Sequence, residues 1–215
     1  MSKRSTPDAT NWAVEYDVEP IRIRDPVAEA LAVLDPGDPF VVSYRDVVKT
    51  AGHSCPTAAG AFRLTQVALD ALYPDSLPVR SNIEVRAGGP KDDAAYGVTA
   101  NLVAAITGAA ESDGFGGLAG GFGGRDNMLS YGVFGDEGVQ FAFARTDTDD
   151  TVVVTYHVAD VPTLGPEGQY LTKIVDGNAT AQERDAFANA WHTRVQAVLD
   201  DEDLFTIERV DDLPE

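Results

Sequence analysis

The segment Pro56–Tyr73 constrains the fold most, because it predicts a helix that is apolar around most of its circumference. Its polar residues form one narrow stripe at helical spacing, made of Arg63, Gln66 and Asp70. Other elements must cover such a helix on several sides to remove its apolar surface from water. We therefore expect this helix in the core, with its first residues held in a well-defined position.

The rest of the chain predicts helices and strands that do not alternate as regular βαβ units. Asp25 followed by Pro26 is typical of a helix N-cap with proline at the first helical position. Periodicity and turn residues predict helices at 26–34, 43–49, 94–108 and 180–199, and strands at 79–86, 130–135, 139–145, 151–158 and 204–210. We expect an α+β fold, with a flexible N-terminal segment at 1–20 and a single domain at 21–215 whose antiparallel β-sheet is packed by helices.

The charge of the chain is strongly one-sided. The chain has 35 acidic and 16 basic residues, so its net charge is -19 and its pI is about 4.3. Acidic residues spread along the chain, with few lysines, are typical of a surface adapted to high salt, where screening weakens self-repulsion. An ordinary acidic protein is the alternative. No cluster of Lys and Arg could neutralise phosphates, so we expect neither nucleic acid nor membranes as partners.

Cysteine content and hydropathy indicate the compartment. The chain has one cysteine, Cys55, so no disulfide can form within it. No apolar run approaches the roughly 20 residues of a membrane-spanning helix, and the first residues do not resemble a signal peptide. We expect a cytoplasmic protein.

The stretch TAGHSCP at 50–56 places this cysteine where the core helix is expected to begin. At a helix N-terminus, free backbone N–H groups and the helix dipole favour a thiolate. In a non-helical segment, His53 and Cys55 could bind one metal ion, and zinc accepts a mixed sulfur and nitrogen ligand set. A closed zinc site needs four ligands, however, and the chain has no second cysteine.

Other interpretations of the two residues stay open. A lone buried cysteine is commonly a small apolar core residue, and a lone histidine is commonly solvated. His157 and His192 could supply further ligands only if the fold brings them near Cys55, and the position of His192 on a helix with a polar face favours exposure.

A glycine-rich stretch at 113–124 precedes a polar triplet. Seven of its twelve residues are glycine, so its backbone N–H groups could surround an anion. It lacks the GxxxxGK[ST] pattern of a P-loop, and a loop that packs through its apolar residues is the alternative. Arg125 and Asn127, which follow directly, are candidates for substrate contacts.

At GHSCP the sequence resembles the family of formylmethanofuran dehydrogenase E-like proteins, whose members carry a GHxCP element at the start of a helix. The resemblance extends to the aromatic–arginine pair Phe62-Arg63, to Ile106-Thr107-Gly108 and to Arg125-Asp126-Asn127. It implies an α+β domain, commonly dimeric, with a pocket that contains the motif histidine and cysteine and often a bound metal. Together with the acidic composition, it indicates a member from a halophilic archaeon.

The chain also departs from this family. Thr57 stands where a glycine usually follows CP, and further cysteines common in the family are absent, as at Ala109 and Ala110. Many members also carry a C-terminal zinc-binding domain, which has no counterpart here. Only His53 and Cys55 carry over as metal ligands.

Three functional hypotheses result. The first is a metal-binding protein with His53 and Cys55 as ligands of a divalent metal such as zinc, with Arg63, Arg125 and Asn127 contacting a substrate. The second is a metal-free protein in which Cys55 is a reactive, catalytic thiol. The third is a non-catalytic subunit that binds a small molecule or belongs to a larger enzyme complex. The resemblance favours a homodimer in each case.

Overall fold

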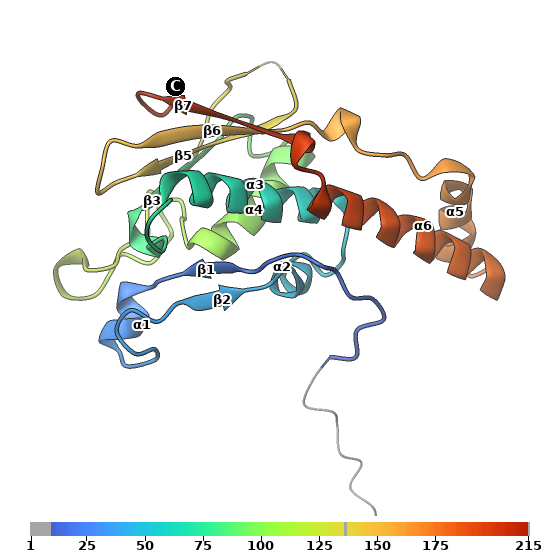
Figure 1. The fold of residues 1–215 in the computed structure, drawn as a ribbon, viewed down its shortest axis with the longest axis horizontal. Coiled ribbons are helices and arrows are strands. Elements are labelled where there is room, and N and C mark those ends of the chain that lie inside the picture. Colours follow the sequence, from blue (N-terminus) through green and yellow to red (C-terminus); the bar gives the residue numbers. More distant parts are fainter. Residues whose placement is uncertain (1–9, 136, 215) are drawn as a thin grey trace, which may run out of the picture.

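The computed structural model describes residues 10–135 and 137–214 and confirms an α+β fold (Figure 1). Its helices and strands, in chain order, are β1 (Ile21–Ile23), α1 (Pro26–Ala30), β2 (Phe40–Val42), α2 (Tyr44–Ala51), α3 (Pro56–Leu72), β3 (Ile83–Ala87), α4 (Ala94–Thr107), β4 (Leu129–Tyr131), β5 (Val139–Arg145), β6 (Thr151–Tyr156), α5 (Tyr170–Val175), α6 (Ala181–Asp200) and β7 (Phe205–Val210). Within these residues, no helix has both the length and the apolarity needed to span a membrane.

The larger sheet has five strands in the order β4-β3-β5-β6-β7. Strand β6 pairs antiparallel with both β5 and β7, and β3 pairs antiparallel with β5. Strand β4 instead runs parallel to β3, with Val85 opposite Leu129. The sheet is therefore mixed, and not purely antiparallel as expected, because α4 and the glycine-rich loop form a long crossover that returns the chain in the original direction.

Helix α3 lies at the centre of the molecule, as its apolar circumference predicts. Figure 1 shows three layers, in which α3 and α4 lie between the five-stranded sheet and a layer formed by β1, β2 and α2. Helix α3 packs against α4, α6, α2 and strand β6. Phe62 on α3 and Phe141 and Phe143 on β5 are completely buried. The layers thus hide nearly the whole surface of α3.

Several short elements differ from the sequence prediction. Helix α1 ends at Ala30, before the expected residue 34, and Ala32 has a positive φ of 54° that is incompatible with continuing the helix. Strands β1 and β2, three residues each, were not predicted, because they are too short to show alternation. Helix α5 was also missed, since none of its residues is buried and it has no apolar stripe to detect.

Part of the segment expected to be flexible is attached to the domain. Asp17 exchanges two hydrogen bonds with Gln196 on α6: its N–H donates to Oε1 at 3.0 Å, and its carbonyl accepts from Nε2 at 2.8 Å. Residues 1–9 lie outside the described part of the chain. Flexibility of the segment 1–20 stays a prediction.

Close packing between α3 and β6 depends on Gly60. A Cβ atom at this position would lie 2.3 Å from the ring of Tyr156. That ring has little freedom to move, because it stacks on Phe205 with centroids 5.0 Å apart and its hydroxyl donates to the Pro56 carbonyl at 3.3 Å. Gly60 therefore sets how closely the helix approaches the sheet beside the start of α3.

We predict that Gly60→Ala destabilises the protein by about 1–3 kcal/mol through overpacking, although alanine is the better helix former. Gly116→Ala is the matched control, since a Cβ there meets nothing within 4 Å and its φ is not positive. Urea denaturation of the two variants checks this prediction. Equal stability of both would contradict the packing role of Gly60.

Candidate functional site

Cys55 is the N-cap residue of α3, in agreement with the sequence prediction. Its backbone is extended (φ −154°, ψ 167°), Pro56 occupies the first helical position, and Sγ accepts the N–H of Ala58 at 3.4 Å. The residue is half-buried, and its side chain packs against the core. Sulfur is thus held at the positive end of a 17-residue helix, in contact with one of the free N–H groups there.

His53 is exposed and lies between α2 and α3. Helix α2 ends at Gly52 in the left-handed conformation, with φ of 77°, which turns the chain toward His53. The imidazole Nδ1 lies 3.0 Å from the carbonyl oxygen of Ala51. Because a carbonyl oxygen can only accept, Nδ1 carries the proton in this contact. In neutral His53 the lone pair is therefore on Nε2.

A chain of hydroxyl groups lies behind Cys55. Tyr44 and Ser54 contact each other through Oη and Oγ at 2.9 Å, and Ser54 donates to the hydroxyl of Tyr16 at 2.9 Å. The Tyr16 hydroxyl is in turn 2.6 Å from Nδ1 of His192. Four segments thus meet here: the N-terminal segment, α2, the α2–α3 connection and α6.

The proton count fixes the direction of the bonds at Ser54. Each hydroxyl has one proton, and the Ser54 proton goes to Tyr16, so Tyr44 donates to Ser54. The tautomer of His192 sets the direction of its bond with Tyr16. Burial lowers the pKa of His192, which favours the neutral imidazole. Burial also raises the pKa of Tyr16 and Tyr44, so both phenols stay protonated at neutral pH. His192 is half-buried and hydrogen-bonded, contrary to the exposed position expected from the sequence.

Two further contacts hold the segment 54–56 in place. Trp191 on α6 donates from Nε1 to the Ser54 carbonyl at 2.8 Å, and Tyr156 donates to the Pro56 carbonyl. The backbone before and after Cys55 is therefore bound to α6 on one side and to β6 on the other. This gives the thiol a defined position relative to its neighbours.

The residues around Cys55 do not form a complete metal site. In the part of the chain that the structure describes, no three residues of the types His, Cys, Asp and Glu lie close enough together to hold a metal ion. One ring nitrogen of each other histidine is engaged, Nδ1 of His192 by Tyr16 and Nε2 of His157 by Thr206 Oγ1 at 3.0 Å. His53 and Cys55 are the two candidate ligands predicted from the sequence, and among the described residues no group of three potential ligands forms around them. Two ligands do not match the three or four protein ligands of zinc sites.

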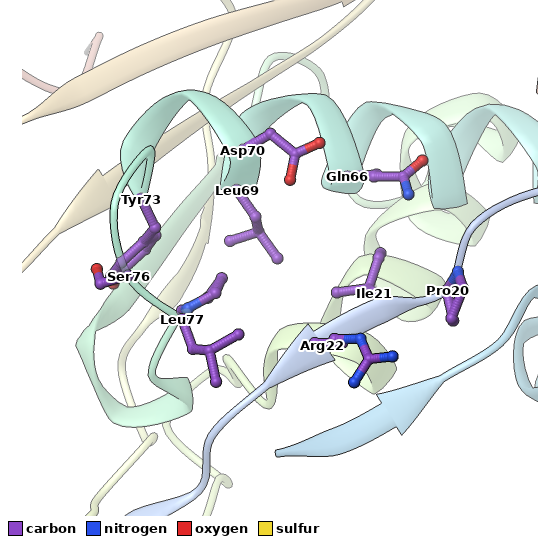
Figure 2. Close-up of a pocket in the computed structure, with 10 residues that line it drawn as sticks. Pro20, Ile21, Arg22, Gln66, Leu69, Asp70, Tyr73, Ser76 and Leu77 are labelled. Atoms are coloured by element: carbon purple, nitrogen blue, oxygen red, sulfur yellow. The ribbon is translucent and has the colours of Figure 1, made fainter. Parts of the chain in front are cut away.

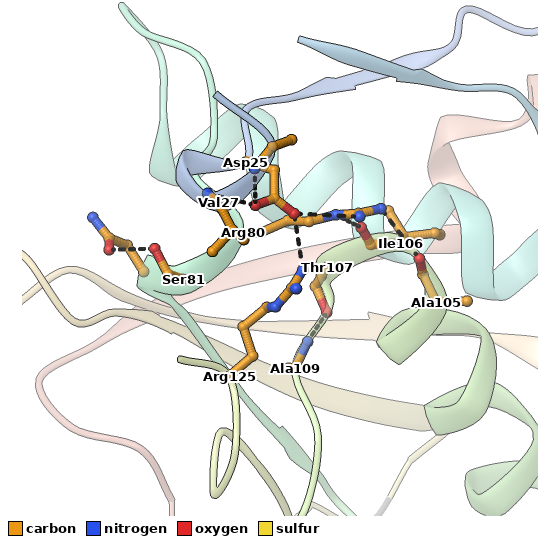
Figure 3. A network of polar contacts seen from close by, with 11 residues as sticks. Asp25, Val27, Arg80, Ser81, Ala105, Ile106, Thr107, Ala109 and Arg125 are labelled. Carbon is orange, nitrogen blue, oxygen red and sulfur yellow. Dashed lines mark hydrogen bonds and ion pairs between the residues drawn. The ribbon is translucent and has the colours of Figure 1, made fainter. Parts of the chain in front are cut away.

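Arg125, a candidate for substrate contact, is instead engaged by Asp25 (Figure 3). Its Nη1 lies 2.9 Å from Asp25 Oδ2, and Arg80 Nη1 lies 3.7 Å from the same oxygen. Asp25 is only 5% exposed, and its Oδ1 accepts the N–H groups of Val27 and Ala28 as the N-cap of α1. One buried carboxylate thus connects α1, the residue after the glycine-rich loop, and Arg80.

Arg63 and Asn127, the other two candidates, are each hydrogen-bonded to a near neighbour in the chain. Arg63 Nη1 donates to Gln66 Oε1 on the same helix. Asn127 is exposed, has a positive φ of 56° and donates to Asp126 Oδ2 at 3.1 Å. The hydrogen bonds of the described residues join neither side chain to Cys55 or His53.

The glycine-rich loop packs on itself and on α1. The N–H groups of Leu118, Gly121 and Gly124 donate to carbonyl groups within the loop, so they are not free to bind an anion. A Cβ at Gly117 would lie 2.4 Å from the Gly121 backbone, and one at Gly123 would lie 2.3 Å from Val27 Cγ2. These contacts favour the packing interpretation of the loop.

The sequence did not point to the tyrosines or Trp191 as neighbours of Cys55, and it offered His192 only as a metal ligand that the fold would have to bring near. Tyr16 and His192 are 176 positions apart, and no motif connects them. Ser54 was inside the GHSCP element but carried no signal of its own. One available indication was that Tyr16, Tyr44 and Trp191 all lie in or beside polar segments, where a large aromatic residue needs a hydrogen-bond partner once buried.

No protein-family model matches this chain, and no curated protein matches its sequence. The resemblance to formylmethanofuran dehydrogenase E-like proteins through GHSCP therefore stays a prediction. The site is defined by its geometry alone: an N-cap thiol, an exposed imidazole and a chain of hydroxyl groups.

We predict that Asp25→Asn destabilises the protein by about 3–5 kcal/mol, because it leaves two largely buried guanidinium groups without a carboxylate. Asparagine is also a good N-cap, so the loss of the charge is isolated from the loss of the cap. Glu15→Gln is the control, since Glu15 pairs with Arg45 on the surface, where such pairs contribute about 0–1 kcal/mol. A similar loss in both variants, measured by urea denaturation, would argue against the buried network.

A second prediction concerns pH. The pKa of His192 is lower in the folded protein than in the unfolded chain, so the unfolded chain binds more protons between the two values and stability falls as the pH decreases. His192→Gln removes this contribution, whereas His53, His157 and the carboxylates remain in both proteins. The stability difference between wild type and variant should be constant above about pH 7 and shift against the wild type toward about pH 5. A difference that does not vary with pH would exclude this role.

Proposed function

We propose that the chain is a metal-free thiol protein in which Cys55 reacts with small electrophilic molecules. The observation that carries the proposal is the position of Sγ at the N-cap of α3, where it accepts the N–H of Ala58. A negatively charged sulfur, the form that acts as a nucleophile, is stabilised by such N–H groups and by the helix dipole.

The hydroxyl chain supports this proposal by positioning the thiol. Ser54, the residue before Cys55, is bound through its side chain to Tyr44 and Tyr16 and through its carbonyl to Trp191. These contacts restrict the backbone at the point where the sulfur must approach an electrophile. We regard the four residues as positioning residues, since no hydrogen bond among the described residues joins their side chains to Sγ.

Alkylation by iodoacetamide tests the proposal. The sulfur displaces iodide, forming one S–C bond as one C–I bond breaks, and mass spectrometry reports a single adduct because Cys55 is the only cysteine. We expect the native protein to react several-fold faster at neutral pH than a peptide of residues 50–63, which has the same local sequence without the folded helix. Cys55→Ser should form no adduct. A native rate equal to or below that of the peptide would refute the proposal.

A second candidate function is binding of a divalent metal by His53 and Cys55. It is favoured by one observation, the contact of His53 Nδ1 with the Ala51 carbonyl, because metal-binding histidines commonly donate one ring N–H to such a partner and bind through the other nitrogen. With two ligands from this chain, the remaining positions would be left to water or a bound ligand.

The same alkylation assay separates the two candidates. If zinc binds, added Zn²⁺ should protect Cys55 from iodoacetamide, and His53→Gln should abolish most of that protection. His157→Gln is the matched control, because His157 is engaged by Thr206 and should leave protection unchanged. Absence of protection in the wild type would exclude the metal candidate while leaving the thiol proposal to its own test.

A further inference from the structure

Large apolar side chains are exposed where the glycine-rich loop meets α1. Leu31 and Val33 follow α1, Phe115 and Phe122 belong to the loop, and each of the four is between 40% and 64% exposed. Both segments lie at the same end of the molecule, on the left in Figure 1. We refer to these four side chains as the apolar patch. Single exposed apolar side chains are normal on a protein surface, whereas several gathered together indicate an interaction site.

The loop half of the patch packs directly on the α1 half. Gly123 lies so close to α1 that a Cβ there would be 2.3 Å from Val27 Cγ2. Leu31 is four positions after Val27, and its N–H donates to the Val27 carbonyl at 3.0 Å. Residues four apart in a helical turn lie on the same face. Leu31 is therefore on the face of α1 that receives the loop.

A second link between the two halves runs through Arg125. Its guanidinium lies over the ring of Phe115, with Cζ 5.4 Å from the ring centroid. The same guanidinium binds the Asp25 carboxylate, which caps α1 (Figure 3). A surface that is already held in one arrangement loses less conformational entropy when it binds. These contacts preorganise the apolar patch for binding.

The charges left unpaired beside the patch are negative. Asp35 and Asp38 follow Val33, Asp113 precedes Phe115, and all three aspartates are exposed. In the described part of the chain, none of the three forms an ion pair. The cations of the same segments and their neighbours are already paired: Arg24 with Glu29, Lys91 with Glu111, and Arg125 with Asp25.

A complementary partner must therefore bring both apolar and positively charged groups. A second copy of this chain does not, because a symmetric dimer would place the patch and its aspartates against themselves, on chains of net charge -19. A lipid bilayer also fits poorly. The patch has none of the Trp, Tyr, Lys or Arg side chains that anchor proteins at the lipid interface, and anionic lipids would repel the aspartates.

We propose that the apolar patch binds an amphipathic segment of a partner protein, with apolar side chains on one face and lysine or arginine beside them. The apolar side chains would pack on Leu31 and Phe122, and the cations would pair with the three aspartates. Binding here does not involve Cys55, so it is independent of the proposed thiol chemistry.

The probe is a fluorescently labelled peptide of leucine and lysine, roughly 14 residues or four helical turns long, with its leucines on one face. Two matched peptides carry glutamate in place of lysine or serine in place of leucine. In anisotropy titrations with the full chain, we expect the leucine–lysine peptide to bind at least about tenfold tighter than either matched peptide. Added salt should weaken its binding, because ion pairs contribute. Equal binding of the three peptides would overturn the proposal.

Serine variants locate the binding on the patch. Leu31→Ser combined with Phe122→Ser should weaken binding of the leucine–lysine peptide about tenfold, because the apolar contacts are lost. Leu171→Ser combined with Val175→Ser is the matched control, since both residues are exposed and apolar but lie on α5. The control should bind as the wild type does, and circular dichroism should show that both variants are folded.

Asparagine variants test the contribution of the aspartates. Asp35→Asn combined with Asp38→Asn should reduce the salt dependence of binding. Asp75→Asn combined with Asp176→Asn is the matched control, because it removes two exposed charges elsewhere and gives the same net charge. An equal effect of the two pairs would show only a general attraction to an acidic protein and would overturn the proposal.

Two other occupants are outcomes of the same experiments. Self-association of the chain, measured by sedimentation, that Leu31→Ser with Phe122→Ser abolishes would assign the patch to a second copy. Binding to phosphatidylcholine vesicles that the same variant abolishes would assign it to a membrane surface. Either result, or peptide binding that the serine variant leaves unchanged, would overturn the proposal.

Discussion

The structure depends above all on the enclosure of α3. A helix with an apolar surface on nearly every side is stable in water only if other elements cover it all round. The five-stranded sheet covers one side, α4 and α6 lie alongside, and β1, β2 and α2 close the remaining side (Figure 1). Cys55 occupies one end of α3, and a small pocket lined by Asp70 and Arg22 lies toward the other (Figure 2).

A buried charge network attaches the N-terminal layer to the rest. Asp25 caps α1 through one oxygen and contacts Arg125 and Arg80 through the other. Arg80 also donates from Nε to the Ile106 carbonyl at 3.1 Å, at the C-terminal end of α4, where the helix dipole is negative. The Asp25 carboxylate and the negative end of α4 together compensate the positive charges of Arg80 and Arg125. The arginine that the sequence suggested for substrate binding thus has a structural partner in this layer.

Much of the fold could be predicted from local signals. The start of α3 at Pro56, the cap of α4 at Gly108 and the N-cap of α6 at Thr180 each follow from a residue with a strong preference for that position in a helix. The three-residue strands and α5 could not be predicted, because elements this short carry too little periodicity. The parallel pairing of β4 with β3 also escaped prediction, since strand direction depends on the path of a long crossover and not on the residues of either strand.

In the candidate site, too, some features follow from the local sequence and others only from the tertiary structure. The sequence by itself determined that Cys55 would begin a core helix, because the preference of proline for the first helical turn and the restriction of polar residues to one narrow stripe are local properties. Only the tertiary structure decided what surrounds the thiol: the hydroxyl chain from Tyr44 to His192, the contact of Trp191 with the Ser54 carbonyl, and the lack of a third metal ligand among the described residues. Those neighbours come from distant segments. Their meeting depends on how α6 and the N-terminal segment pack, and pairs of residues so far apart in the chain leave no pattern in a single sequence.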